Sequence, residues 1–110
     1  MPIEYDVLEK NNANYAPLSV ASFLERTAYI YPEREAVFYE DRSYNWSEVQ
    51  GRCLKLASAL NARGLGGNDT VSVLLFNTPE MFECQFAVPI AGCVLTVSYT
   101  HLTLPTILLV

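Results

Sequence analysis

The most regular hydrophobic pattern in the chain lies in residues 47–63. Apolar side chains recur there at spacings of three and four residues, which places them on one face of a helix: Val49, Cys53, Leu56, Ala57 and Leu60. Ser47 and Gln50 have the spacing of a capping box, in which two side chains satisfy free amides of the first turn. Glu48 and Arg52 lie four residues apart on the polar face and are expected to pair. The pattern therefore predicts a helix over residues 47–63.

A shorter amphipathic helix is expected nearer the N-terminus, after an irregular arm formed by residues 1–16. Ser19 can cap a helix of residues 20–31. The apolar face of this helix would comprise Val20, Phe23, Leu24, Thr27 and Ala28. Pro32 is expected to end it, because the residue before a proline is disfavoured in helical geometry.

A β-hairpin is predicted between the two helices. Residues 35–40 form a short apolar run between charges, and Asp41 and Arg42 are expected to turn the chain. Tyr44 and Trp46 then alternate with polar residues, which places both aromatic rings on one face of the second strand.

The C-terminal part of the chain predicts a β-α-β unit. Residues 70–76 begin with alternating valines and end apolar on both faces, which is typical of a strand covered on both sides in a parallel sheet. Thr78 and Pro79 suit the N-cap and the first residue of a helix over 79–92. The apolar face of this helix would comprise Phe82, Phe86 and Ile90. Another strand begins at 93–96, and the crossover between the two strands should be right-handed.

Composition indicates one globular domain or part of one. The 110 residues are 51% apolar and 17% charged, and 12 acidic against 7 basic residues give a formal charge of −5. A nucleic-acid-binding surface is therefore not expected, because neutralising phosphates requires clustered Lys and Arg. No charged residue follows Glu83, but Pro89, Pro105 and several threonines argue against a membrane span in this stretch.

The cysteines and the histidine do not indicate reactive chemistry. Three cysteines cannot form a closed set of disulfides, and no signal peptide is recognisable, so an intracellular protein is expected. Cys53, Cys84 and Cys93 lie in apolar surroundings and are interpreted as buried structural thiols. His101 is the single histidine and no short metal-ligand spacing occurs, so no metal site is expected.

Two segments were candidates for ligand-binding loops. Residues 64–67 contain three glycines, but they follow a helix and precede a strand, whereas a phosphate-binding loop leads from a strand into a helix. They are interpreted as a left-handed helix end and a turn. Residues 77–79 lie between a strand and a helix, where ligands bind in open α/β sheets, and they either cap the helix or contact a ligand. No catalytic, cofactor-binding or metal-binding residue is assigned.

The end of the chain has an unusual sequence. Residues 97–106, Val-Ser-Tyr-Thr-His-Leu-Thr-Leu-Pro-Thr, resemble the conceptual translation of a transposase adaptor used in sequencing libraries. With this origin, residues 97–110 would be a non-native tail and His101 would have no evolved role. The alternative is an ordinary threonine-rich terminal strand.

Seven ordered segments in residues 1–96 carry a family resemblance. They are 14–19, 22–26, 31–34, 44–46, 52–60, 77–81 and 88–92. The series resembles the start of plant acyl-activating enzymes, members of the AMP-dependent synthetase/ligase (adenylate-forming) family. The resemblance implies an α/β fold in which helix, β-hairpin, helix and β-α-β unit form the N-terminal piece of a large N-terminal domain. Residues 1–96 are accordingly expected to be a partial AMP-binding domain.

The same resemblance implies an activity for a longer parent protein. Enzymes of this family activate a carboxylic acid, fatty or aromatic, with ATP and Mg²⁺, and transfer the acyl group to CoA. Their phosphate loop, ribose-binding motif and catalytic lysine lie downstream and have no counterpart in these 110 residues, so the chain by itself is expected to be inactive. A cytoplasmic or peroxisomal location is implied. The alternative is a free-standing small α/β interaction module without catalytic activity.

Overall fold

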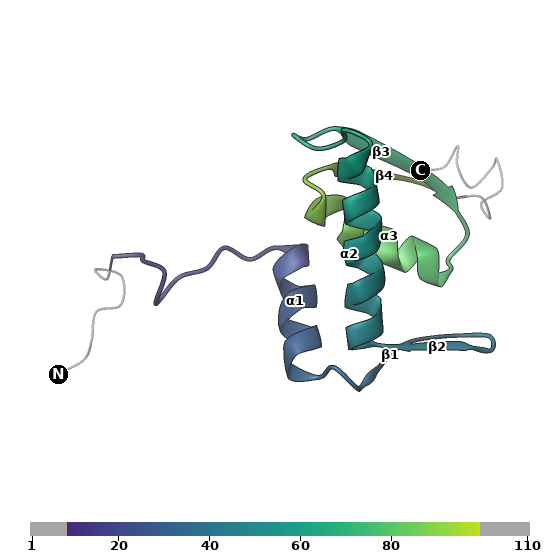
Figure 1. Cartoon of the computed structure of the whole chain (residues 1–110), viewed down its shortest axis with the longest axis horizontal. Helices are drawn as coiled ribbons and strands as arrows, with labels where there is room; N and C mark the ends of the chain where they lie inside the picture. Colours follow the sequence, from purple (N-terminus) through teal and green to yellow (C-terminus); the bar gives the residue numbers. More distant parts are fainter. Residues whose placement is uncertain (1–8, 100–110) are drawn as a thin grey trace, which may run out of the picture.

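The computed structural model describes residues 9–99 and shows an α/β arrangement (Figure 1). The elements follow one another as α1 (Val20–Ile30), β1 (Glu35–Tyr39), β2 (Arg42–Asn45), α2 (Trp46–Ala62), β3 (Thr70–Leu75), α3 (Pro79–Ile90) and β4 (Val94–Tyr99). The predicted order of helix, hairpin, helix and β-α-β unit is confirmed. The three helices pack on one another, with the β3–β4 sheet at one end of α2 and the hairpin at the other (Figure 1).

Helix α1 begins and ends where the sequence indicates. Ser19 is the N-cap: its hydroxyl oxygen accepts a hydrogen bond from the Ser22 amide at 3.1 Å, and the Ser22 side chain bonds back to the Ser19 amide. The helix buries Leu24 and Ala28 against α2 and α3. The predicted apolar face is too wide, however, because half of the Phe23 side chain remains exposed.

The β1–β2 hairpin is antiparallel, but its turn differs from the prediction. Tyr39 pairs with Arg42, so the turn residues are Glu40 and Asp41 rather than Asp41 and Arg42. Glu40 adopts a left-handed conformation with φ of 52°, which a tight two-residue hairpin turn requires. Trp46 was expected in the second strand of the hairpin. It is instead the first residue of α2.

Helix α2 is capped by a residue that the sequence pattern did not single out. The side-chain oxygen of Asn45 accepts a hydrogen bond from the Glu48 amide at 2.8 Å. The predicted Ser47–Gln50 capping box is therefore wrong, because Asn45 is an equally good cap and starts the helix one residue earlier. The predicted apolar stripe is confirmed, with its buried members Val49, Cys53 and Ala57.

The β-α-β unit is parallel, as predicted. Val73 of β3 lies beside Val97 of β4, and Pro79 is the first residue of α3. Pro89 lies in the last turn of α3, which ends at Ile90, earlier than expected. Strand β3 alternates between half-buried and exposed residues along its whole length, and Leu74 is 66% exposed. The expectation that the end of β3 is covered on both faces is thus not met in the part of the chain that the structure describes.

Two hydrophobic clusters hold the elements together. The first lies beneath the β3–β4 sheet and is formed by Ala57, Cys84, Val88, Ala91 and Cys93. The second lies between the helices and the hairpin and is formed by Leu24, Val49, Cys53 and Ala87. Because α2 and α3 contribute to both clusters, these two helices form the framework on which the hairpin and the sheet are mounted.

Candidate functional site

A groove lies between the hairpin and the N-terminal end of α3. It has a volume of about 390 Å³. It is lined by residues of β1, by the β3–α3 junction and by the first turns of α3: Ala36, Val37, Phe38, Tyr39, Asn77, Thr78, Pro79, Met81, Phe82 and Gln85. The lining is mainly apolar and aromatic, with uncharged polar groups at Asn77, Thr78 and Gln85. Such a surface suits an apolar group with a few hydrogen bonds better than a phosphate.

The groove contains the junction that the sequence analysis singled out. Thr78 is the N-cap residue of α3 in its backbone conformation, with φ of −115° and ψ of 170°, but its side chain makes no cap hydrogen bond. Its amide donates instead to the Phe76 carbonyl at 2.8 Å. Thr78 is therefore the N-cap residue, as predicted, although its side chain does not cap the helix. Contact of residues 77–79 with a ligand stays a prediction.

The glycine-rich segment 64–67 is engaged by the protein itself. Gly64 has a φ of 83° just after α2, as predicted for a left-handed helix end. The Gly66 amide donates to the Asp69 carboxylate at 3.1 Å, and the Asp69 amide donates to the Gly66 carbonyl at 2.9 Å. The Val94 amide in turn donates to the Asp69 carbonyl at 2.8 Å. These bonds join the end of α2 to the start of β4, so the segment serves as a structural turn.

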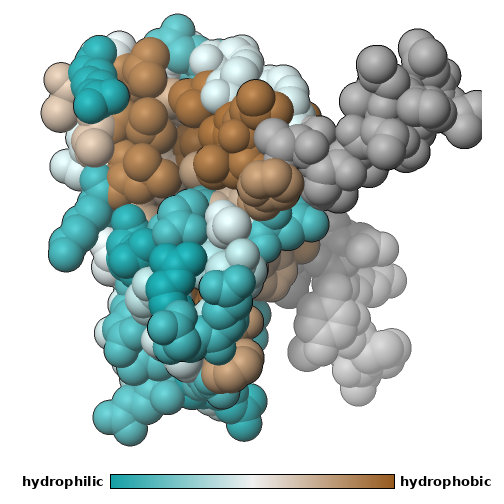
Figure 2. Space-filling model, turned by 90° about the vertical axis from the view of Figure 1, so that its right-hand side faces the viewer, coloured by the Kyte–Doolittle hydropathy of each residue, from teal (hydrophilic) through white to brown (hydrophobic). Residues whose placement is uncertain are grey.

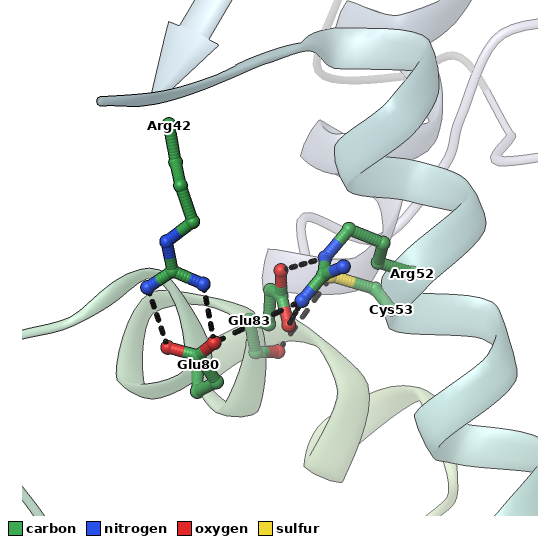
Figure 3. Close-up of polar contacts among 5 residues, drawn as sticks. All are labelled: Arg42, Arg52, Cys53, Glu80 and Glu83. Atoms are coloured by element: carbon green, nitrogen blue, oxygen red, sulfur yellow. Dashed lines mark hydrogen bonds and ion pairs between the residues drawn. The ribbon is translucent and has the colours of Figure 1, made fainter. Parts of the chain in front are cut away.

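Four charged residues form a network that joins the hairpin, α2 and α3 (Figure 3). Arg42 of β2 makes two hydrogen bonds to Glu80, with Nη1–Oε1 at 2.8 Å and Nη2–Oε2 at 3.3 Å. Arg52 of α2 binds Glu83 through Nε and Nη2, the latter at 3.4 Å from Oε2. A contact of 4.0 Å between Arg52 Nη2 and Glu80 Oε1 connects the two pairs.

The sequence analysis missed this network. The expected Glu48–Arg52 pair is not formed, because Arg52 turns toward α3 and its guanidinium lies 4.6 Å from the Tyr44 ring centre. A signal was present in Glu83, a carboxylate that lies between the apolar residues Phe82 and Cys84 in the middle of a helix. Only 6% of Glu83 is exposed, and a buried carboxylate requires a cationic partner.

The charges of Arg42, Arg52 and Glu80 stay fixed near neutral pH. The hydrogen bonds from Arg42 lower the pKa of Glu80 from 4.5 to about 2, and the same bonds raise the pKa of Arg42. Hydrogen bonding to Glu83 likewise raises the pKa of Arg52. A carboxylate with so low a pKa is a poor general base or acid, since proton transfer needs a pKa near the working pH. The Arg42–Glu80 pair is therefore suited to holding the hairpin against α3 and not to proton transfer.

The three cysteines are buried and unpaired with one another, as predicted. Burial raises the pKa of the Cys53 thiol to about 12, and burial also raises the pKa of Cys84. The Cys53 thiol donates to the Glu83 carbonyl at 3.6 Å. Because the thiolate is the nucleophilic form, these residues are unsuited to covalent catalysis.

The groove and the charged network do not supply the groups that a magnesium nucleotide needs. Among residues 9–99, no three His, Cys, Asp or Glu side chains are close enough to hold a metal ion. The groove has no charged lining residue, and Arg42 and Arg52 are both bound to carboxylates. The donor set of this segment thus does not fit ATP with Mg²⁺, and no reaction step is assigned to its residues. Within the same residues, no helix has the length and apolar character needed to cross a bilayer.

The fold is shared with one class of enzymes of known structure. The N-terminal subdomain of NpsA from Klebsiella oxytoca superposes with a TM-score of 0.71 at 21% identity, over 76% of this chain and 22% of that one. A putative long-chain-fatty-acid CoA ligase from Rhodopseudomonas palustris superposes with a TM-score of 0.72 at 28% identity, over 78% of this chain and 22% of that one. The fold is that of a part of the N-terminal subdomain of adenylate-forming enzymes, as predicted.

The chain belongs to the AMP-binding enzyme family, whose model matches residues 24–109. The matched range includes part of the predicted tail, and the origin of residues 97–110 stays a prediction. The resemblance to plant acyl-activating enzymes is confirmed by a probable acyl-activating enzyme of Arabidopsis thaliana, 44% identical over 91% of this chain and 19% of that protein. An acetate–CoA ligase of Humulus lupulus is 41% identical over 94% of this chain and 18% of that protein. The chain thus spans less than a fifth of the length of these relatives.

Proposed function

We propose that this chain is the N-terminal part of a plant acyl-CoA ligase. The proposal rests on sequence identity to two proteins named as CoA ligases. The chain is 39% identical to one and 41% identical to the other, in each case over 94% of its length. In this proposal, residues 1–96 of the chain are part of the AMP-binding domain of the parent, and residues 97–110 are a non-native tail that the parent lacks. A cytoplasmic or peroxisomal location is proposed because one relative, an acetate/butyrate–CoA ligase of Arabidopsis thaliana, is named as peroxisomal.

The parent reaction has two steps. A carboxylate oxygen of a fatty or aromatic acid attacks the α-phosphate of ATP, a new P–O bond forms, and the bond to pyrophosphate breaks. Mg²⁺ held by other parts of the parent would offset the charge of the phosphates. The CoA thiol then attacks the acyl carbon, which forms the thioester and releases AMP. The part played by the present segment in the parent is structural, since it supplies strand β3, the start of the parallel strand beside it and the helices that pack beneath them.

The 110-residue chain is proposed to have no ligase activity by itself. The family's phosphate loop, ribose-binding motif and catalytic lysine have no counterpart in its sequence, and the groove beside α3 has no charged lining residue. Enzymes catalyse phosphoryl transfer mainly by positioning the phosphates and stabilising their charge, and the groove of this segment supplies no charged group for either task.

Release of pyrophosphate tests the proposal. The purified chain is incubated with ATP, Mg²⁺, CoA and a panel of short, long and aromatic acids, and the full-length hop acetate–CoA ligase serves as the positive control. We expect no release above a heat-denatured sample of the chain, while the control turns over. Acid-dependent release of pyrophosphate by the chain would overturn the proposal of inactivity. Recovery of the downstream reading frame would test whether the chain comes from a longer ligase.

A free-standing interaction module is the second candidate. Two clusters that share α2 and α3 form a small core of their own, which favours this alternative. Thermal unfolding of residues 1–96 discriminates between the two. A sharp cooperative transition from a soluble monomer favours the module, whereas a broad transition with aggregation favours part of a larger domain.

A further inference from the structure

The hairpin is anchored to the rest of the molecule near its base. Ala36, Val37 and Tyr44 pack against the second hydrophobic cluster. Beyond them lie residues 38–43, which we call the hairpin tip. No residue of the hairpin tip is fully buried, and Phe38 is 75% exposed. Figure 2 shows a mainly hydrophilic surface at the level of the hairpin, in contrast to the hydrophobic side chains at the level of the β3–β4 sheet.

A single ion pair joins the hairpin tip to α3 among the described residues. The Arg42 guanidinium binds the Glu80 carboxylate with two hydrogen bonds, the shorter of 2.8 Å (Figure 3). In the part of the chain that the structure describes, this pair supplies every hydrogen bond between the hairpin and α3. The two side chains are 37% and 44% exposed. Ion pairs so exposed add little stability, since water and salt screen them, and this contact can therefore open.

The hairpin and α3 also form the walls of the groove. Phe38 and Tyr39 of the hairpin tip line it on one side, and Thr78 and Gln85 line it on the other. The width of the groove therefore depends on how closely the hairpin tip lies against α3. A two-stranded hairpin is marginally stable alone, and segments with few buried contacts are those that open at a low cost in free energy.

We propose that the hairpin tip is a flap over the groove, and that the Arg42–Glu80 pair is its latch. With the pair formed, the hairpin tip lies against α3 and the groove is narrow. When the pair breaks, the hairpin tip turns away from α3 on its anchored base, and the groove widens. The latch joins two described residues, so it does not depend on any part of the chain outside residues 9–99.

Paramagnetic relaxation enhancement in nuclear magnetic resonance tests the proposal with the full chain. A nitroxide label is attached at the exposed turn through Asp41→Cys, since the native cysteines are buried. The label should broaden the amide signals of the first turns of α3. Arg42→Met and Glu80→Gln should each reduce this broadening by about twofold or more, the effect expected on the closed fraction when a screened ion pair is lost. Arg34→Met is the matched control: it removes the same charge just before β1, leaves the latch intact and should leave the broadening unchanged.

Salt gives a second test of the latch. At about 1 M salt the screening length is about 3 Å, so the broadening should fall in the labelled chain and change little in its Arg42→Met variant. Circular dichroism shows which variants keep the fold. Broadening that salt or either folded variant leaves unchanged would overturn the proposal. Unfolding of both variants would also overturn it, because the pair would then support the whole fold rather than the hairpin tip. These outcomes are separate from the ligase assignment, which the downstream reading frame tests.

Discussion

The guanidinium of Arg52 in α2 donates to the buried carboxylate of Glu83 in α3, although the two residues are far apart in the sequence. Glu83 is nearly inaccessible, whereas Arg52 is partly exposed, so the arginine reaches inward along the side of α2 to meet it. The same pair adjoins the Arg42–Glu80 pair, and the four residues fix the angle between the hairpin and the helices (Figure 3). The first prediction concerns this buried pair.

Replacing Arg52 by Met should lower the free energy of unfolding by about 2 kcal/mol, because Glu83 is left buried without a cation. Adding Glu83→Leu to this variant should restore most of the loss, since two well-packed apolar residues can replace a buried ion pair. Lys55→Met, at an exposed position of the same helix, is the control and should change little. Urea unfolding measures all four proteins. A double variant less stable than Arg52→Met would contradict the prediction.

The Arg42–Glu80 pair predicts a loss of stability in acid. Because the pKa of Glu80 falls from 4.5 unfolded to about 2 folded, its contribution is complete above pH 4.5 and is lost as the pH falls toward 2. The pair is partly exposed to solvent, where water and salt screen the charges, so the effect should be small. Urea midpoints measured across this pH range should fall less steeply for Glu80→Gln than for the original chain. Equal slopes would show that Glu80 does not titrate in this way.

The N-cap of α2 predicts unequal effects at two nearby polar residues. Asn45→Ala should destabilise the chain by about 1 kcal/mol, because the Glu48 amide loses its acceptor. Ser47→Ala should be almost neutral, since Ser47 lies inside the first turn and is exposed. Thermal unfolding of the two variants measures the difference. A larger effect at Ser47 would instead support the capping box inferred from the sequence.

The buried thiols predict slow alkylation. A rise in the pKa of Cys53 from 9.0 to about 12 lowers its thiolate fraction by about three orders of magnitude, and burial limits access further. Labelling with iodoacetamide at mildly alkaline pH, followed by peptide mass spectrometry, should modify Cys53 rapidly in urea and hardly at all in the folded chain. A free model thiol in the same solution gives the reference rate. Labelling of Cys53 at that rate without urea would refute its burial.

The features that local sequence determined are those governed by nearest neighbours along the chain. The spacing of Val49, Cys53 and Ala57 defines a helix face whatever lies opposite it, and Gly64 adopts a left-handed conformation because it lacks a side chain. The order of strand, Pro79 and strand was sufficient to predict a parallel β-α-β unit. The ordered segments of residues 1–96 were also sufficient to predict the family, because a family resemblance is read from the order and identity of residues and needs no tertiary structure.

The tertiary structure decided which of several adequate local choices is used. Asn45 and Ser47 can both cap a helix, and the position of the hairpin selects Asn45. Arg52 has two possible partners, Glu48 on its own helix and Glu83 on α3. It pairs with Glu83, because Glu83 is buried and needs a cationic partner, whereas Glu48 is exposed to water. Which face of β3 is covered is likewise set by where α3 packs, since the alternation of residues marks two faces and does not say what lies beyond each of them.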